Sequence, residues 1–186
     1  MIKKIIKKIR EKMARRIAPD CGGLWKVRTK VEKYCEDIAL FAGRKHEFYS
    51  KFRPYDVVEV ERNGLLNEGI NELWPLICGG SATAYNNANA RLGVGDSSAA
   101  FNATHTDLQA ATNKLFKAME TGYPTYGSAQ KATFKASFSS AEANWAWNEW
   151  GLDNGVAAAK NMNRKVETLG TKTTGTWVLT VEISLS

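Results

Sequence analysis

The sequence predicts a mainly β protein, an antiparallel sheet or sandwich with an N-terminal helical arm and one helix at the start of the β domain. Two segments carry this prediction because apolar and polar residues alternate along them, residues 131–138 without interruption and residues 177–185 with Val178 as the one apolar residue on the polar side. Such alternation is typical of strands that bury one face. A third observation is that strand-like segments follow one another without helices between them, which favours antiparallel pairing.

The first 43 residues are predicted to form two amphipathic helices. In the first, apolar residues recur at the spacing of one helix face, and these are Ile2, Ile5, Ile6, Ile9, Met13 and Ile17. Pro19 and the following glycine pair would end it. The second helix is expected on the same criterion, from Leu24, Val27, Val31, Tyr34, Ile38 and Phe41. Gly43 fits the position after its last turn.

We place a domain boundary near residue 55, where the composition changes. A basic helical region, residues 1–55, would then precede a β-rich domain, residues 56–186. Asn63 is suited to cap the one helix of that domain, and Pro75 would kink or end it. Its apolar side is predicted to consist of Leu66, Ile70, Leu73, Trp74 and Ile77.

Beyond Ser81 the sequence predicts strands joined by polar loops. Besides the two alternating segments, strands are expected over residues 91–96, 144–152 and 162–169, and a short helix around Thr106, Asp107 and Leu108. Gly93 and Gly95 are interpreted as relief from crowding where one strand passes another backbone. A dinucleotide-binding loop would need a third glycine where the chain has Ser98.

The net charge of +7 belongs almost entirely to the arm, because residues 1–16 hold eight Lys and Arg against one Glu. The rest of the chain is close to neutral, which argues against a folded nucleic-acid-binding face, so any nucleic-acid contact is expected only through the arm. The candidate anchor residues are Ile2, Ile5, Ile6 and Ile9 with Lys3, Lys4, Lys7, Lys8 and Arg10. Such a helix suits a protein groove, an anionic surface, nucleic acid or the chain's own body.

The chemistry-bearing residues do not form a recognisable catalytic or metal-binding pattern, so we expect no enzyme, cofactor or metal. Cys21, Cys35 and Cys78 are widely spaced, and Cys78 is expected to be buried at a helix end. His46 and His105 lie far apart, without further ligands at metal-binding spacing. No stretch is apolar enough for a membrane span. Asp96 and Glu149 could form the carboxylate pair of a small hydrolase, but carboxylates beside Gly and Asn more often fix loops by hydrogen bonding, and this is the favoured interpretation.

Three tryptophans, Trp145, Trp147 and Trp150, lie within six residues. On a regular strand the first two would share one face and the third would point to the other. The favoured interpretation is a central strand with its rings in the core. The alternative is that one face makes an aromatic contact with a partner.

Read together, the motifs resemble small virion structural proteins of tailed bacteriophages and, in layout, the N-terminal attachment domains of tail-collar and tail-fibre proteins. The residues that carry the resemblance are Arg91-Leu-Gly-Val-Gly-Asp96, Thr106-Asp-Leu108, Ala132-Thr-Phe-Lys-Ala-Ser-Phe138, Ala143-Asn144, Trp147-Asn-Glu-Trp-Gly-Leu152, Asn161-Met-Asn-Arg164 and Leu169-Gly-Thr-Lys172. They cover roughly residues 60–186.

The resemblance implies an assembly role without catalysis, in a virion assembled in the host cytoplasm. A chain of this length suits a capsid decoration protein, a head-fibre base or a small tail or baseplate component. Its partners would be other capsid or tail proteins, and a homo-oligomer is expected. The alternative is a host-surface module of the virion that binds a carbohydrate or receptor.

Overall fold

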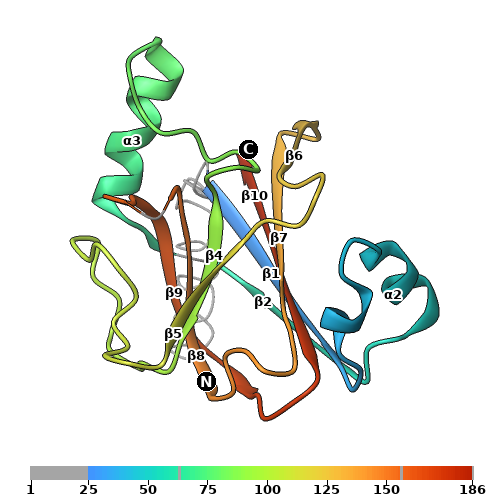
Figure 1. The fold of residues 1–186 in the computed structure, drawn as a ribbon. Coiled ribbons are helices and arrows are strands. Elements are labelled where there is room, and N and C mark those ends of the chain that lie inside the picture. The colour runs from blue at the N-terminus through green and yellow to red at the C-terminus, as the bar shows by residue number, and fades with distance from the viewer. Residues whose placement is uncertain (1–24, 63, 156, 186) are drawn as a thin grey trace, which may run out of the picture.

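The computed structural model describes residues 25–62, 64–155 and 157–185. Within them the chain forms two five-stranded antiparallel sheets (Figure 1). Buried side chains from both sheets join in one hydrophobic cluster, with Leu179 and Phe134 from one and Leu92 and Trp150 from the other. The molecule is therefore a β-sandwich, and the predicted mainly β, antiparallel fold is confirmed.

The first sheet has the order β2-β1-β10-β7-β6, and the second has the order β3-β9-β8-β4-β5. The strands of the first sheet are β2 (Asp56–Glu61), β1 (Trp25–Tyr34), β10 (Thr176–Leu185), β7 (Lys131–Phe138) and β6 (Thr125–Ser128). Those of the second are β3 (Gly64–Leu65), β9 (Asn161–Thr171), β8 (Ala146–Asp153), β4 (Arg91–Gly95) and β5 (Lys114–Ala118). The helical elements are η1 (Ile38–Phe41), a 3-10 helix, with α2 (Lys45–Lys51) and α3 (Asn67–Cys78).

The two alternating segments are the strands β7 and β10, and they pair with each other from Trp177 opposite Phe138 to Ser184 opposite Lys131. The apolar face of β10 lies in the core as predicted, with Trp177, Leu179, Val181 and Ile183 buried. Val178, on the opposite face, is buried as well, because the segment after β1 covers it. The strands predicted over residues 91–96, 144–152 and 162–169 are present as β4, β8 and β9.

The helix predicted from Leu24 to Phe41 is wrong over most of its length, because residues 25–34 form the strand β1. Val27, Thr29 and Val31 are buried at every second position, which is the period of a strand. β1 pairs with β10 over ten residues and with β2 over six. The predicted boundary near residue 55 therefore falls between two strands of one sheet. The first predicted helix, together with the arm residues, lies outside the described part of the chain.

Of the described residues in the helix predicted from Leu24 to Phe41, only the last four are helical, and they form η1. Residues 35–55 form η1 and α2, whose aromatic side chains pack edge to face around Phe48. This second cluster contains Tyr34, Ile38 and Val178 as its other buried members. It covers the outer face of β10 at one end of the sandwich, which is why both faces of that strand are apolar there.

The predicted helix at the start of the β domain is confirmed as α3. It begins at Asn67 after Leu66, keeps Pro75 inside its last turn and ends at Gly79, whose φ of 75° is left-handed. Asn63, the predicted cap, lies outside the described residues. Among the residues that the structure describes, no helix is long and apolar enough to cross a membrane.

Candidate functional site

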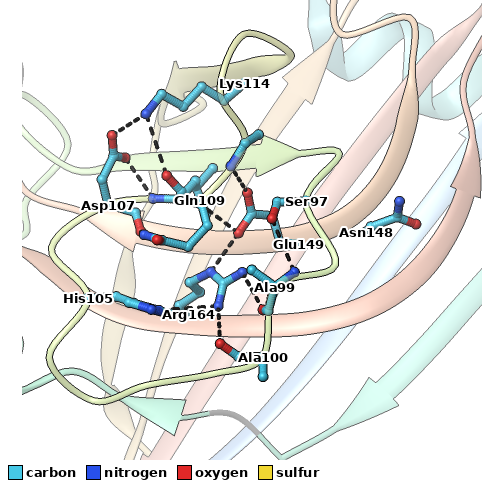
Figure 2. A network of polar contacts seen from close by, with 12 residues as sticks. Ser97, Ala99, Ala100, His105, Asp107, Gln109, Lys114, Asn148, Glu149 and Arg164 are labelled. Carbon is cyan, nitrogen blue, oxygen red and sulfur yellow. Dashed lines mark hydrogen bonds and ion pairs between the residues drawn. The ribbon is translucent and has the colours of Figure 1, made fainter.

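The connection between β4 and β5, residues 96–113, is a long loop held against β8 and β9, and we call it the anchored loop. Its main attachment is Glu149 of β8, which is fully buried. The carboxylate accepts hydrogen bonds from the backbone N–H groups of Gln109, at 3.0 Å, and Ala110, at 2.7 Å. Figure 2 shows the carboxylate between this part of the loop and Arg164. Glu149 thus fixes the second half of the loop.

Arg164 of β9 fixes the first half of the same loop. Its Nε donates to Oε2 of Glu149 at 2.5 Å, and the guanidinium is almost completely buried. The remaining nitrogens donate to the carbonyl oxygen of Ala99 at 2.9 Å and contact Nδ1 of His105 at 3.3 Å (Figure 2). The buried charge pair therefore connects both halves of the loop to two neighbouring strands.

The pairing of β8 with β9 is irregular next to Glu149. The pairing register between β8 and β9 shifts between Trp147 and Glu149. Asn148 and Glu149 both bind the anchored loop, since Asn148 donates to the carbonyl oxygen of Asp96 at 3.0 Å. Trp147 and Trp150 consequently both lie in the core, fully buried. The prediction that they occupy opposite faces is wrong, because it assumed a regular strand.

Two glycines of β4 leave room for this arrangement. A Cβ atom on Gly95 would lie 2.6 Å from Oε1 of Glu149 and 3.0 Å from Cβ of Ala110. A Cβ atom on Gly93 would lie 2.5 Å from the ring of Phe116 on β5. The predicted crowding at both positions is confirmed, but its predicted source is wrong, because the nearest atoms belong to side chains that pack over the strand and not to another backbone.

The middle of the anchored loop, residues 106–108, is the segment for which the sequence predicts a short helix. Thr106, Asp107 and Leu108 are irregular in the structure, so the predicted helix is wrong. The amide of Asn161 on β9 donates to the carbonyl oxygen of Thr106 at 2.7 Å. Asp107 accepts from its neighbour's N–H at 2.7 Å and pairs with Lys114. The conformation of residues 106–108 is therefore set by their contacts with Asn161 and Lys114 and not by helical hydrogen bonds.

A second ion pair, between Arg91 and Asp153, lies at the other end of β8. Arg91 donates from Nε to Oδ1 of Asp153 at 2.9 Å, and the aspartate is buried. Burial raises the pKa of Asp153, and Arg91 opposes that rise. Because Arg91 and Asp153 face each other across the β4–β8 pair, this contact fixes the register of the two strands that carry the anchored loop.

The two carboxylates considered from the sequence both have structural partners. Glu149 has the three donors described above, and Asp96 accepts from the side chain of Asn113 at 2.7 Å. Both therefore act as groups that fix the loop. Sequence reasoning named Glu149 but not its partner Arg164, although Arg164 ends the Asn161-Met-Asn-Arg164 motif. The signal that could have identified it is an arginine inside the strand predicted over residues 162–169 of a nearly neutral domain.

The other residues that the sequence suggested for a site do not lie together in the structure. The arm residues lie outside the described chain, and Trp145 is only partly buried at the start of β8. Cys78, expected to be buried, is exposed at the end of α3, because that end of the helix projects beyond the sheets. His105 belongs to the Arg164 contacts, whereas His46 lies in α2. Within the described ranges, no three His, Cys, Asp or Glu side chains are grouped so that they could hold a metal ion.

The network can hold a loop rigidly, because the buried Glu149 carboxylate accepts from two backbone N–H groups of the loop and from Arg164. Comparison of the chain with models of known protein families, with characterised proteins and with solved structures finds no match.

Proposed function

We propose that the chain is a non-enzymatic structural protein of a tailed-bacteriophage virion, either a capsid decoration protein or head-fibre base or a small tail or baseplate component. It would act through contacts with other capsid or tail proteins and as a homo-oligomer. The proposal starts from the sequence resemblance, and one structural observation supports it.

That observation is the convergence of the resembling motifs on the anchored loop. The motif at residues 91–96 supplies its start, and the motif at residues 106–108 supplies its middle. The motifs at residues 147–152 and 161–164 supply Glu149 and Arg164, which hold it. Motifs that are separated in sequence therefore serve one purpose, the fixing of a loop on a sandwich. A rigid loop on a stable scaffold is suited to binding, because little conformational freedom is lost on association.

The anchored loop presents Phe101 as its exposed aromatic residue, with 43% of the residue accessible. The ring lies against the backbone of Gly64, where a Cβ atom would be only 2.2 Å from it. Exposed aromatic residues that are held in place are typical of the energetic centres of protein interfaces. We therefore assign Phe101 as the centre of the assembly contact.

The alternative, a module that binds a host carbohydrate or receptor, rests on exposed tryptophans and on the Asn- and Thr-containing loops. Trp147 and Trp150 are unavailable to a ligand, because both are completely buried. The polar part of the alternative remains, because Asn102 and Thr104 of the anchored loop are exposed.

The test is mass spectrometry of purified particles whose genome encodes this chain, with copy number determined for the wild type and for Phe101→Asp. We expect the wild type in every particle and the variant at a copy number lowered at least about tenfold. Tyr126→Asp is the matched control, since Tyr126 is 81% exposed but lies on β6 in the other sheet. Particles without the wild-type chain would overturn the proposal, and binding of the purified chain to host cells instead would support the alternative.

A further inference from the structure

The second half of α3 has an outer side without a partner among the described residues. Residues 73–77 are five consecutive apolar residues, of which Leu73 and Leu76 pack against the core of the sandwich. Trp74 and Ile77, three residues apart, face away from that contact and are 60% and 71% exposed. A helix that is apolar on all sides is normally covered on all sides. We call the exposed surface made by Trp74 and Ile77 the α3 patch.

The first half of the helix is firmly attached, so the exposure does not come from a poorly placed element. Glu68 accepts from the backbone N–H of Asn161 at 2.7 Å. Gly69 lies so close to β9 that a Cβ atom would be 2.4 Å from Cα of Met162. Figure 1 shows the helix leaving the sheets beyond this attachment, with its end projecting from the sandwich. The α3 patch is thus a defined surface on a fixed support.

The charge on the second half of α3 is complementary to a basic partner. The helix carries Glu68 and Glu72 and no Lys or Arg. Glu68 faces Lys160 at 3.9 Å, whereas the contacts of Glu72 with described residues are to neutral groups, the N–H of Thr83 and the amide of Asn154. The carbonyl groups at a helix C-terminus carry a partial negative charge, which cations stabilise. The partner that fits is therefore apolar on one side and positively charged beside it.

Residues 1–17 of this chain have both properties. Their isoleucines recur at helical spacing, and they carry eight Lys and Arg against one Glu. The linker, residues 18–24, spans up to about 23 Å when extended. It enters β1 at Trp25, which pairs with Leu185 at the end of β10. In Figure 1 this end of the sandwich is also the one from which α3 projects.

We infer that residues 1–17 of this chain pack on the α3 patch. The isoleucine stripe would cover Trp74 and Ile77, and the lysines would lie beside Glu72 and the C-terminal end of α3. The patch and the segment each bury an apolar surface that neither can bury alone, since a helix of this length is marginal in water without packing. This inference concerns the free protein and is independent of the virion role.

Cysteine cross-linking tests the contact directly, because Cys78 is exposed beside the α3 patch. In the full chain with Cys21→Ser and Cys35→Ser, Lys8→Cys introduces a thiol next to the isoleucine stripe. A short bismaleimide reagent should link Lys8→Cys to Cys78 within one chain, with a yield at least about tenfold above the control. The control keeps Lys8→Cys but moves the second thiol with Cys78→Ser and Lys131→Cys, on the outer face of β7.

Hydrogen exchange of the α3 amides provides a second measurement on the full chain. Ile5→Asp combined with Ile9→Asp should raise the exchange rate of residues 74–78 by about tenfold, because the cover is lost. Lys4→Gln combined with Lys8→Gln leaves the isoleucines in place and should raise it less. Amides of β10 should not change in either variant, which would show that the sandwich remains folded.

The outcomes separate the inference from its competitors. An intramolecular link together with faster exchange in the isoleucine variant supports it. A link found only between two chains would overturn it and assign the α3 patch to the segment of a second copy. A yield equal to the control, or unchanged exchange, would overturn it and leave the patch to a different protein.

Discussion

Arg164 donates from Nε to Oε2 of Glu149 over 2.5 Å, and this ion pair is buried between the sheet and the anchored loop. The two charges come from adjacent strands, and each also binds backbone groups of the loop. Removing one partner would leave the other as a buried charge without compensation, which costs far more than the loss of an exposed pair.

We therefore expect Arg164→Leu to lower the free energy of unfolding by about 3–5 kcal/mol. The double variant Arg164→Leu with Glu149→Gln should recover part of this loss, because the unpaired carboxylate is replaced by a neutral amide. Chemical denaturation of the four proteins in the cycle measures the coupling. If the double variant is as unstable as the sum of the single variants, the pair is not coupled as described.

An exposed ion pair supplies the control. Lys131 and Glu182 are bonded at 2.9 Å on the outer face of the first sheet, and each side chain is at least one third exposed. Lys131→Ala should change the free energy of unfolding by less than about 1 kcal/mol. A loss comparable to that of Arg164→Leu would show that surface and buried pairs have been confused.

The strands that the sequence predicted best are those with one buried and one solvated face. β7 alternates because its apolar residues face the core and its polar residues lie on the outer face of the sheet, where Lys135 and Ser137 contact Glu120 and Lys45. β1 was mistaken for a helix because Val27, Val31 and Tyr34 also fit helical spacing. The pairing that decides the matter joins Val27 to Ile183, and contacts between residues so far apart leave no local pattern in one sequence.

The same limit applies to the site. The sequence suggested that Glu149 fixes a loop, and the structure agrees. It could not show that Arg164 is the partner, because their proximity depends on the register between β8 and β9, in which Glu149 lies opposite Val166 and Gly151 opposite Arg164. A one-residue change of register moves a side chain to the other face of a sheet, and a single sequence does not reveal where such a shift occurs.

Trp177 tests the predicted core face of β10. Its ring packs edge to face with that of Trp147, with ring centroids 4.9 Å apart, and the residue is buried. Trp177→Ala should destabilise the protein by about 3–5 kcal/mol, as expected for a large core residue. Thermal and chemical denaturation measure the effect, with Thr180→Ala on the polar face as the control. Equal losses for both variants would contradict the assignment of the faces.

The position of β1 predicts where the chain can be shortened. A protein of residues 25–186 retains every strand, whereas one of residues 56–186 lacks the strand between β2 and β10. The shorter protein would expose the edge of β10 and remove Val27 and Val31 from the core. We expect circular dichroism and limited proteolysis to find the longer protein folded and the shorter one unfolded. A compact, protease-resistant protein of residues 56–186 would show that β1 is dispensable.

Glu120 predicts part of the acid sensitivity of the fold. Burial raises the pKa of this carboxyl, but the Tyr49 hydroxyl and the ammonium groups of Lys135 and Lys45 outweigh it and bring the pKa below the ordinary 4.5. As pH falls below about 4.5, the unfolded chain therefore takes up a proton on Glu120 before the folded chain does. The stabilisation from this residue is present above that pH and is lost as pH falls through the lower, folded-state pKa. Glu120→Gln should accordingly lose less stability than the wild type between pH 5 and pH 3.

The matched control for the acid experiment is Glu167→Gln. Its carboxylate contacts Lys165 at 3.5 Å, and the side chain is 42% exposed. Screening by water makes such a pair weak, so this variant should follow the wild-type dependence on pH. Urea denaturation at a series of pH values measures both variants. The opposite result would be that Glu120→Gln keeps the wild-type dependence of the unfolding free energy on pH while Glu167→Gln weakens that dependence. This result would show that Glu120, which contacts both α2 and β7, does not stabilise the fold as its geometry indicates.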